Sequence, residues 1–192
     1  MLNKKISCLL VLASTLGFSA NIFAQEQTIS LGYAQSKVQD LGTIRGVNAQ
    51  YRYEWNEPLS ILTSLSYMQS NVNQRFTDYA GDYYERDAKL KNYSLLAGPA
   101  YRFNEMVSVY GLIGLNHIKA TGDYLWINND AQNTARRGSI SESSTDFAYG
   151  LGMIVNPTAN ISLNAGYEGT KVKLDSEKFS MNGFNLGVGY RF

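Results

Sequence analysis

The chain has 192 residues and a formal net charge of +1, with 14 Tyr and 17 Gly but only 3 Pro and 1 His. This length suits one domain, and a charge balance so close to neutral gives no indication of nucleic-acid binding. The single cysteine, Cys8, lies in an N-terminal segment that we expect to be removed, which excludes a disulfide framework or a catalytic thiol from the mature protein.

The first residues have the pattern of a secretory signal peptide. Lys4 and Lys5 precede an apolar run at residues 6–18, and small residues follow it. The run is shorter than the roughly 20 residues that a spanning helix needs. We predict cleavage after Ala24, with cleavage after Ala20 as the alternative. Residues 1–24 would then form the signal peptide.

The remaining residues, 25–192, alternate between apolar and polar or small side chains with a period of two, which indicates β-strands. Phe147, Tyr149 and Leu151, for example, alternate with Ala148 and Gly150. No apolar run after residue 24 could form a spanning helix, so a membrane location must depend on strands. The predicted strands lie near residues 28–37, 44–54, 59–70, 90–103, 107–120, 145–155, 161–171 and 181–192.

The connections between these strands alternate in length. Those at 55–58, 104–106 and 156–160 are short, and those at 38–43, 71–89, 121–144 and 172–180 are longer. In an up-and-down barrel with an even number of strands, all the short turns fall on one rim, as they do in outer-membrane barrels. The longer loops carry mixed charge with Asn, Ser, Gly and Asp, so they need no buried structure. We therefore predict an all-β fold, an eight-stranded antiparallel up-and-down transmembrane β-barrel with its long loops outside the cell.

Alternation alone fits a soluble barrel with an apolar interior equally well. Here the second face is rich in Gly, Ser, Asn and Arg, which suits a polar interior, and aromatic residues gather near the strand ends as in interfacial girdles. A tripeptide recurs at the ends of three strands, as Tyr51-Arg52-Tyr53, Tyr101-Arg102-Phe103 and Tyr190-Arg191-Phe192. Each copy places two aromatic side chains outward and one arginine inward at the periplasmic rim.

Inward-facing arginines need partners, because an unpaired buried charge is costly. Acidic and hydroxyl side chains with the same inward parity are the candidates. The arrangement can be a structural network that plugs the barrel or an ion pathway. An eight-stranded barrel is only wide enough for its own side chains, which favours the plug. The predicted lumen network consists of Arg52, Glu54, Arg102, Tyr110, Glu168 and Arg191.

Catalysis would require a base beside a nucleophile or a water molecule. The only histidine, His117, has the outward parity of a residue at the membrane interface. The acidic stretch at residues 78–87 lacks the ligand spacing and glycine of a calcium loop. We predict that the protein is not an enzyme and has no metal site and no cofactor.

The loop at 121–144 differs from the other loops in its aromatic and arginine residues. It contains Tyr124, Trp126, Arg136 and Arg137, and aromatic and arginine side chains are favoured anchors of protein interfaces. These four residues are the candidate ligand contacts. The alternative is that the apolar residues of this loop extend the barrel wall above the membrane.

Several short segments, taken together and in this order, resemble the Ail/Lom/OmpX family of enterobacterial outer-membrane proteins. They are residues 29–36, 50–54, 97–102, 108–114, 148–152, 156–157, 166–168 and 187–192. The resemblance implies an eight-stranded barrel in the bacterial outer membrane. In the virulence members of that family, the loops bind host matrix proteins, cell surfaces or complement regulators. Loop 38–43 of this chain is shorter than is usual in the Ail branch.

The resulting hypothesis is an outer-membrane surface protein that acts in adhesion, invasion or serum resistance through its loops. The alternative is a structural envelope protein, or a phage-derived one, without a dedicated ligand, and an outer-membrane enzyme is a more distant third. The expected partners are outer-membrane lipid and lipopolysaccharide, with host extracellular-matrix or complement proteins as candidates. We expect a monomer and no nucleic acid.

Overall fold

The computed structural model describes residues 26–39, 42–56, 58–77, 79, 82–127, 134–174 and 177–192. The predicted signal peptide lies outside these residues. None of the described residues belongs to a helix long and apolar enough to cross a membrane. The strands are β1 (Glu26–Val38), β2 (Gly42–Asn56), β3 (Leu59–Thr77), β4 (Tyr83–Arg102), β5 (Val107–Ile127), β6 (Ala135–Val155), β7 (Ile161–Leu174) and β8 (Glu177–Arg191).

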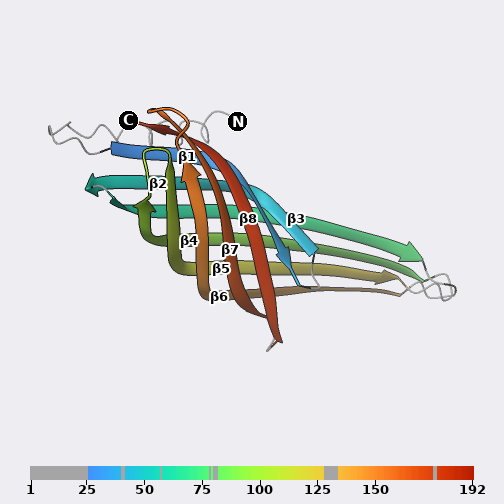
Figure 1. The fold of residues 1–192 in the computed structure, drawn as a ribbon. Helices are drawn as coiled ribbons and strands as arrows, with labels where there is room; N and C mark the ends of the chain where they lie inside the picture. The colour runs from blue at the N-terminus through green and yellow to red at the C-terminus, as the bar shows by residue number, and fades with distance from the viewer. Residues whose placement is uncertain are drawn as a thin grey trace, which may run out of the picture.

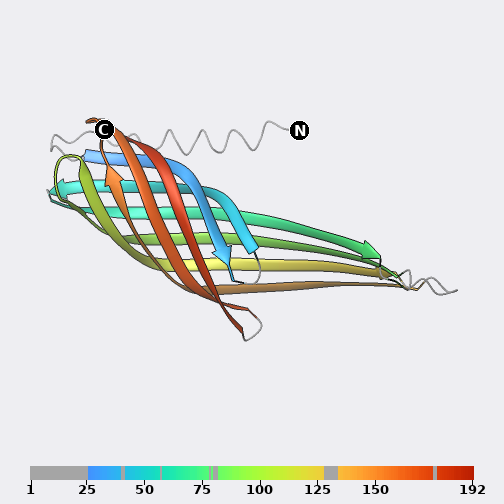
Figure 2. The same ribbon diagram turned by 45° about the vertical axis from the view of Figure 1, so that its right-hand side comes forward.

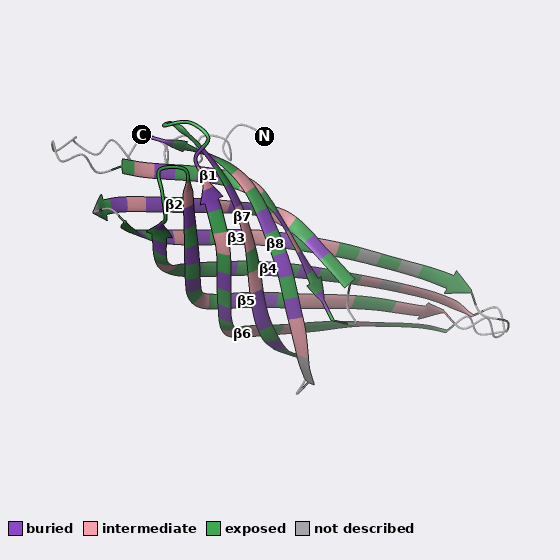
Figure 3. Ribbon diagram, viewed as in Figure 1, coloured by how far each residue is buried: buried purple, intermediate pink, exposed green. Residues whose placement is uncertain are grey.

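Each strand pairs antiparallel with its neighbours in sequence, and β1 also pairs with β8, so the sheet closes into a barrel (Figure 1). The eight-stranded fold predicted from the sequence is confirmed. Its outer surface is apolar, since Leu31 and Val47 keep 69% and 61% of their surface exposed. The inward positions beside them, such as Ser30 and Asn48, are buried. Figure 3 shows this alternation of buried and exposed positions along the strands. An apolar exterior with a polar interior is the arrangement of transmembrane barrels.

The short connections lie together at one end of the barrel. Between β4 and β5, the Asn104 side-chain oxygen accepts hydrogen bonds from the backbone N–H groups of Met106 (2.9 Å) and Val107 (2.8 Å). Between β6 and β7, the Thr158 hydroxyl accepts one from the N–H of Ile161 (3.1 Å). These side chains satisfy backbone donors that the tight turns leave without a partner, so the strand direction reverses within a few residues.

Four strands are much longer than predicted, and the prediction of long loops at 71–89 and 121–144 is wrong for most of their residues; the alternative, in which the 121–144 segment extends the barrel wall, agrees with the structure. β3 continues to Thr77, β4 starts at Tyr83, β5 continues to Ile127, and β6 starts at Ala135. Their pairing is unbroken to the tip. Figures 1 and 2 show these four strands extending far beyond the others.

We call residues 71–77, 83–89, 121–127 and 135–146 the protruding sheet. It lies beyond the closed part of the barrel, because β2 pairs with β3 no further than Gln69 and β7 pairs with β6 only from Ala148. The two faces of the protruding sheet continue the inner and outer faces of the barrel wall.

The lumen contains two apolar clusters. The first closes the end from which the protruding sheet rises, and its members lie near the upper ends of their strands. They are Ala34, Val38, Ile44, Met68, Leu90, Ile118, Val172 and Met181, and we call them the apolar plug. A second cluster lies lower, mostly on β4 and β5, and includes Leu62, Leu96, Tyr110 and Leu112. Polar side chains fill the remaining lumen, so the barrel has a packed interior.

Candidate functional site

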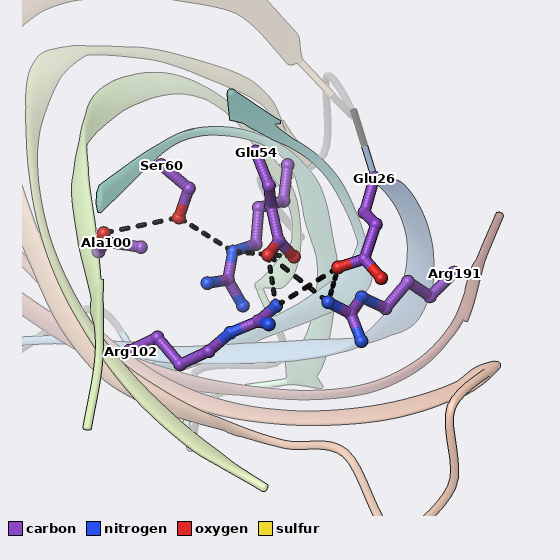
Figure 4. A network of polar contacts seen from close by, with 7 residues as sticks. Glu26, Glu54, Ser60, Ala100, Arg102 and Arg191 are labelled. Carbon is purple, nitrogen blue, oxygen red and sulfur yellow. Dashed lines mark hydrogen bonds and ion pairs between the residues drawn. The ribbon is translucent and has the colours of Figure 1, made fainter. Parts of the chain in front are cut away.

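Three arginines gather around one carboxylate at the end of the barrel with the short turns (Figure 4). Glu54, on β2, contacts the guanidinium of Arg102 from β4. Arg52 Nε lies 3.3 Å from Glu54 Oε1, and Arg191 Nη2 lies 3.5 Å from Glu54 Oε2. Arg52 and Glu54 are buried, with 2% and 7% of their surface exposed. Arg52 also donates a hydrogen bond to Ser60 Oγ (2.8 Å).

A second carboxylate completes this cluster and was not among the predicted residues. Glu26, the first residue of β1, contacts Arg191, and its Oε2 lies 3.7 Å from Arg102 Nη2. Glu26 was not predicted as a lumen residue because it lies before the first predicted strand and close to the expected cleavage site. Its inward parity with Ser30 is the signal that could have found it. The two carboxylates and the three arginines form a network of charge-assisted hydrogen bonds. This network neutralises most of the buried positive charge.

Glu168 does not belong to this cluster, and its expected pairing with an arginine is corrected by the structure. Its carboxylate instead accepts hydrogen bonds from four neutral side chains: Ser94 Oγ (2.9 Å), Ser66 Oγ (3.1 Å), Asn185 Nδ2 (3.3 Å) and Ser64 Oγ (3.4 Å). Glu168 therefore lies further up the lumen than the arginines.

Tyr110 also lies apart from the arginines. Its hydroxyl accepts a hydrogen bond from Gln50 Nε2 (3.4 Å). The hydroxyl reaches the inward positions of Gly152 and Gly166, where any added Cβ would collide with it. The two glycines therefore make room for the ring in the narrow lumen. The residues predicted as one network thus form an arginine cluster and a separate polar layer.

The candidate contacts of the 121–144 segment lie on the protruding sheet. Phe76, Tyr84, Trp126 and Arg136 are successive cross-strand neighbours on the inner face near its tip, and we call them the distal row. Phe76 and Tyr84 stack with ring centroids 4.8 Å apart. The Arg136 guanidinium lies 5.6 Å from the centre of the Trp126 ring, and Trp126 Nε1 donates to Asp82 Oδ2 (3.1 Å). These contacts hold the row in place.

Tyr124 and Arg137 occupy neighbouring rows. Tyr124 keeps 48% of its surface exposed, and its ring lies against Gly138, where a Cβ would collide with it. Arg137 is exposed and points to the outer face of the sheet, by the alternation of the strand. A shallow cavity of about 590 Å³ lies beside it. Its lining includes Glu85, Asp87, Asp123 and Leu125.

His117 lies on the outer surface, where its Nδ1 is 2.8 Å from Thr145 Oγ1. Within the described ranges, no three His, Cys, Asp or Glu residues are grouped so that they could hold a metal ion. The described residues place aromatic and guanidinium groups near the tip of the protruding sheet and a charge-neutralising cluster in the lumen.

Comparison with known proteins identifies the relatives of this chain. Residues 3–192 match the family model described as Enterobacterial Ail/Lom protein. The chain is 40% identical over 170 residues to the virulence membrane protein PagC of Salmonella typhimurium, with 88% of both proteins covered. It is 36% identical over 180 residues to the attachment invasion locus protein of Yersinia pseudotuberculosis, with 91% of this chain and 89% of that protein covered.

The solved structures agree. The crystal structure of Ail from Yersinia pestis is 34% identical, with a TM-score of 0.65, and covers 88% of this chain and 100% of that one. Its complex with the heparin analogue sucrose octasulfate is 35% identical, with a TM-score of 0.63 and the same coverage. The barrel lies in the bacterial outer membrane, with its short turns in the periplasm and the protruding sheet outside the cell. The chain belongs to the enterobacterial Ail/Lom family of outer-membrane proteins.

Proposed function

We propose that this protein acts in adhesion or serum resistance by binding host molecules through its protruding sheet. The observation that carries the proposal is the distal row, which presents three aromatic side chains and Arg136 on one exposed face. Trp, Tyr and Arg are the residues most enriched at the energetic centres of protein interfaces. Strand pairing holds the row on a sheet rather than on loose loops, which lowers the entropy cost of binding.

The adjacent arginines Arg136 and Arg137, at the start of β6, favour an anionic group on the ligand or an acidic protein surface. In the part of the chain that the structure describes, no carboxylate forms an ion pair with Arg136 or Arg137. Both guanidinium groups are therefore available to a partner. A relative, Ail, has been crystallised with a heparin analogue, which supports a ligand of this chemistry. Among the described residues, the apolar plug and the arginine cluster obstruct the lumen, which supports a surface role rather than transport.

The test is a comparison of displayed variants in a non-adherent, serum-sensitive bacterium. It uses the wild type, a double variant Trp126→Ala with Arg136→Ala, and a copy with residues 121–144 replaced by a short turn. Ser141→Ala, on the outer face of the same sheet, is the matched control. Heat-modifiable migration in gels and surface labelling verify that each variant is folded and exposed.

Binding to laminin, fibronectin, heparin and epithelial cells is scored together with survival in serum. We expect the wild type and Ser141→Ala to gain at least one of these properties, and the double variant and the shortened copy to lose it. If the wild type gains none of them, the adhesion proposal is wrong and a structural envelope role replaces it. If the shortened copy performs as well as the wild type, the protruding sheet is not the binding surface.

A further inference from the structure

Glu168 is a carboxylate inside the barrel that has no cationic partner among the described residues. Its four hydrogen-bond donors are neutral side chains from β3, β4 and β8. The arginines that face the closed part of the lumen contact Glu54 and Glu26 instead. A negative charge taken out of water costs several kcal/mol, and neutral hydrogen bonds recover only part of that cost. The site therefore lacks one positive charge.

Glu168 lies in a layer of the lumen between the apolar plug and the arginine cluster. Ser64, Ser66 and Ser94 are at most 2% exposed, although Glu168 itself keeps part of its surface accessible. Because Glu168 points inward, that surface faces the lumen. The apolar plug lies between this layer and the outside of the cell, and the arginine cluster lies between it and the periplasm.

Two further oxygen atoms lie in the same layer without a donor. Gln50 Oε1 and Asn116 Oδ1 are buried and have no hydrogen-bond partner. Their residues are 3% and 1% exposed. Gln50 is the direct cross-strand neighbour of Ser64, and Asn116 that of Ser94, so both flank serines that hold Glu168. Buried carbonyl oxygens without donors are rare in native proteins, and a bound ion or water molecule is one explanation for them.

We propose that the Glu168 layer is a binding site for a monovalent metal cation of the sodium class. A carboxylate, three hydroxyl oxygens and two amide oxygens form an all-oxygen set of the kind that hard cations prefer. One carboxylate balances one positive charge, which favours a monovalent over a divalent ion. Ser64 and Ser66 each donate to the carboxylate and accept a hydrogen bond from Asn48 Nδ2 (2.8 and 2.9 Å), so each hydroxyl keeps one lone pair for the ion. This site is independent of the proposed surface function.

The experiment measures thermal unfolding of the full mature protein, refolded separately into detergent in sodium chloride or in N-methylglucamine chloride at equal ionic strength and pH. Folded and unfolded forms are separated on gels without boiling. We expect the unfolding midpoint of the wild type to rise by about 2–4 °C at a sodium concentration near five times the dissociation constant, and then to increase with the logarithm of the sodium concentration. Glu168→Gln should lose this dependence. Glu105→Gln, which removes an exposed carboxylate from the β4–β5 turn, should keep it.

A wild type with the same midpoint in both salts would overturn the proposal and would indicate a neutral carboxyl group instead. A sodium dependence that persists in Glu168→Gln, or that disappears in Glu105→Gln, would also overturn it. If Glu168→Gln does not fold, Ser66→Ala replaces it, because that variant keeps the carboxylate and removes one oxygen. Ser66→Ala should then reach the same rise of the unfolding midpoint only at a higher sodium concentration, and an unchanged concentration would count against the site.

Discussion

Glu26 and Glu54 lie directly opposite each other on β1 and β2, and both of their carboxylates contact Arg102 and Arg191. Two like charges in such a position repel each other. The arginines come from β4 and β8, so the repulsion between neighbouring strands is turned into attraction across the lumen. The cluster thereby joins four of the eight strands at the periplasmic end.

Replacing Glu54 by Gln should lower the free energy of unfolding by about 3–5 kcal/mol, because the three arginines of the cluster then share a single carboxylate. The measurement is equilibrium unfolding in urea with the protein in detergent micelles. Glu26→Gln is the control, and it should cost less because Glu26 is 47% exposed. Equal effects of the two substitutions would contradict the central position of Glu54.

Gly166→Ala should destabilise the barrel by about 1–3 kcal/mol, since the new Cβ collides with the Tyr110 hydroxyl. Tyr110→Phe removes that hydroxyl, so the double variant should be more stable than the sum of the single effects allows. Gly111→Ala is the matched control, because nothing lies within 4 Å of a Cβ added there. Strict additivity in the urea unfolding of the four proteins would show that the collision is relieved in another way.

Ile118→Ala, within the apolar plug, should cost about 2–5 kcal/mol because it opens a cavity in a packed cluster. Ile113 lies on the same strand but faces lipid, with 63% of its surface exposed. Lipid chains can fill the space that its truncation leaves, so Ile113→Ala should cost clearly less. Chemical unfolding in vesicles measures the free energy of unfolding of both variants. A larger decrease for Ile113→Ala than for Ile118→Ala would show that the apolar plug does not stabilise the barrel.

Planar-bilayer recordings of the wild type should show no steady, wide conductance, because the apolar plug and the arginine cluster both obstruct the lumen. A variant with Ile44, Met68 and Ile118 all changed to Ser should admit water at the outer end, and short openings should become more frequent. The same three changes at the lipid-facing positions Ile61, Leu65 and Ile113 serve as the control for general disruption. A wide wild-type conductance would refute the closed lumen.

The sequence was sufficient for the strand number, the inward parity and the position of the short turns. A period of two places each side chain on a definite face, and a lipid-facing wall demands an apolar residue at every second position. The length of β3 to β6 could not be predicted in this way. Above the membrane both faces meet water, so the apolar alternation fades, while backbone hydrogen bonds and cross-strand pairs such as Phe76 and Tyr84 continue the sheet.

The hydrogen-bond partners of Glu168 could not be predicted from the sequence for a different reason. Parity states that a side chain points into the lumen, but its height depends on the tilt of the strands and on the stagger that accumulates around the barrel. That stagger brings Glu168 level with Ser66 and Ser94 rather than with Arg52. Prediction of such a pair requires the register of every strand between the two residues.

The arginine cluster also ties stability to the order of assembly. Arg191 is the last residue of β8 and Glu26 the first of β1, and their strands meet at the seam where Gln27 and Phe192 exchange backbone hydrogen bonds. Pairing of segments so distant in sequence forms slowly. The Arg191–Glu26 ion pair joins the two strands of this seam, so it can form only when β1 and β8 meet. The pair therefore stabilises the closed barrel relative to every form in which the seam is open and Arg191 is hydrated by water.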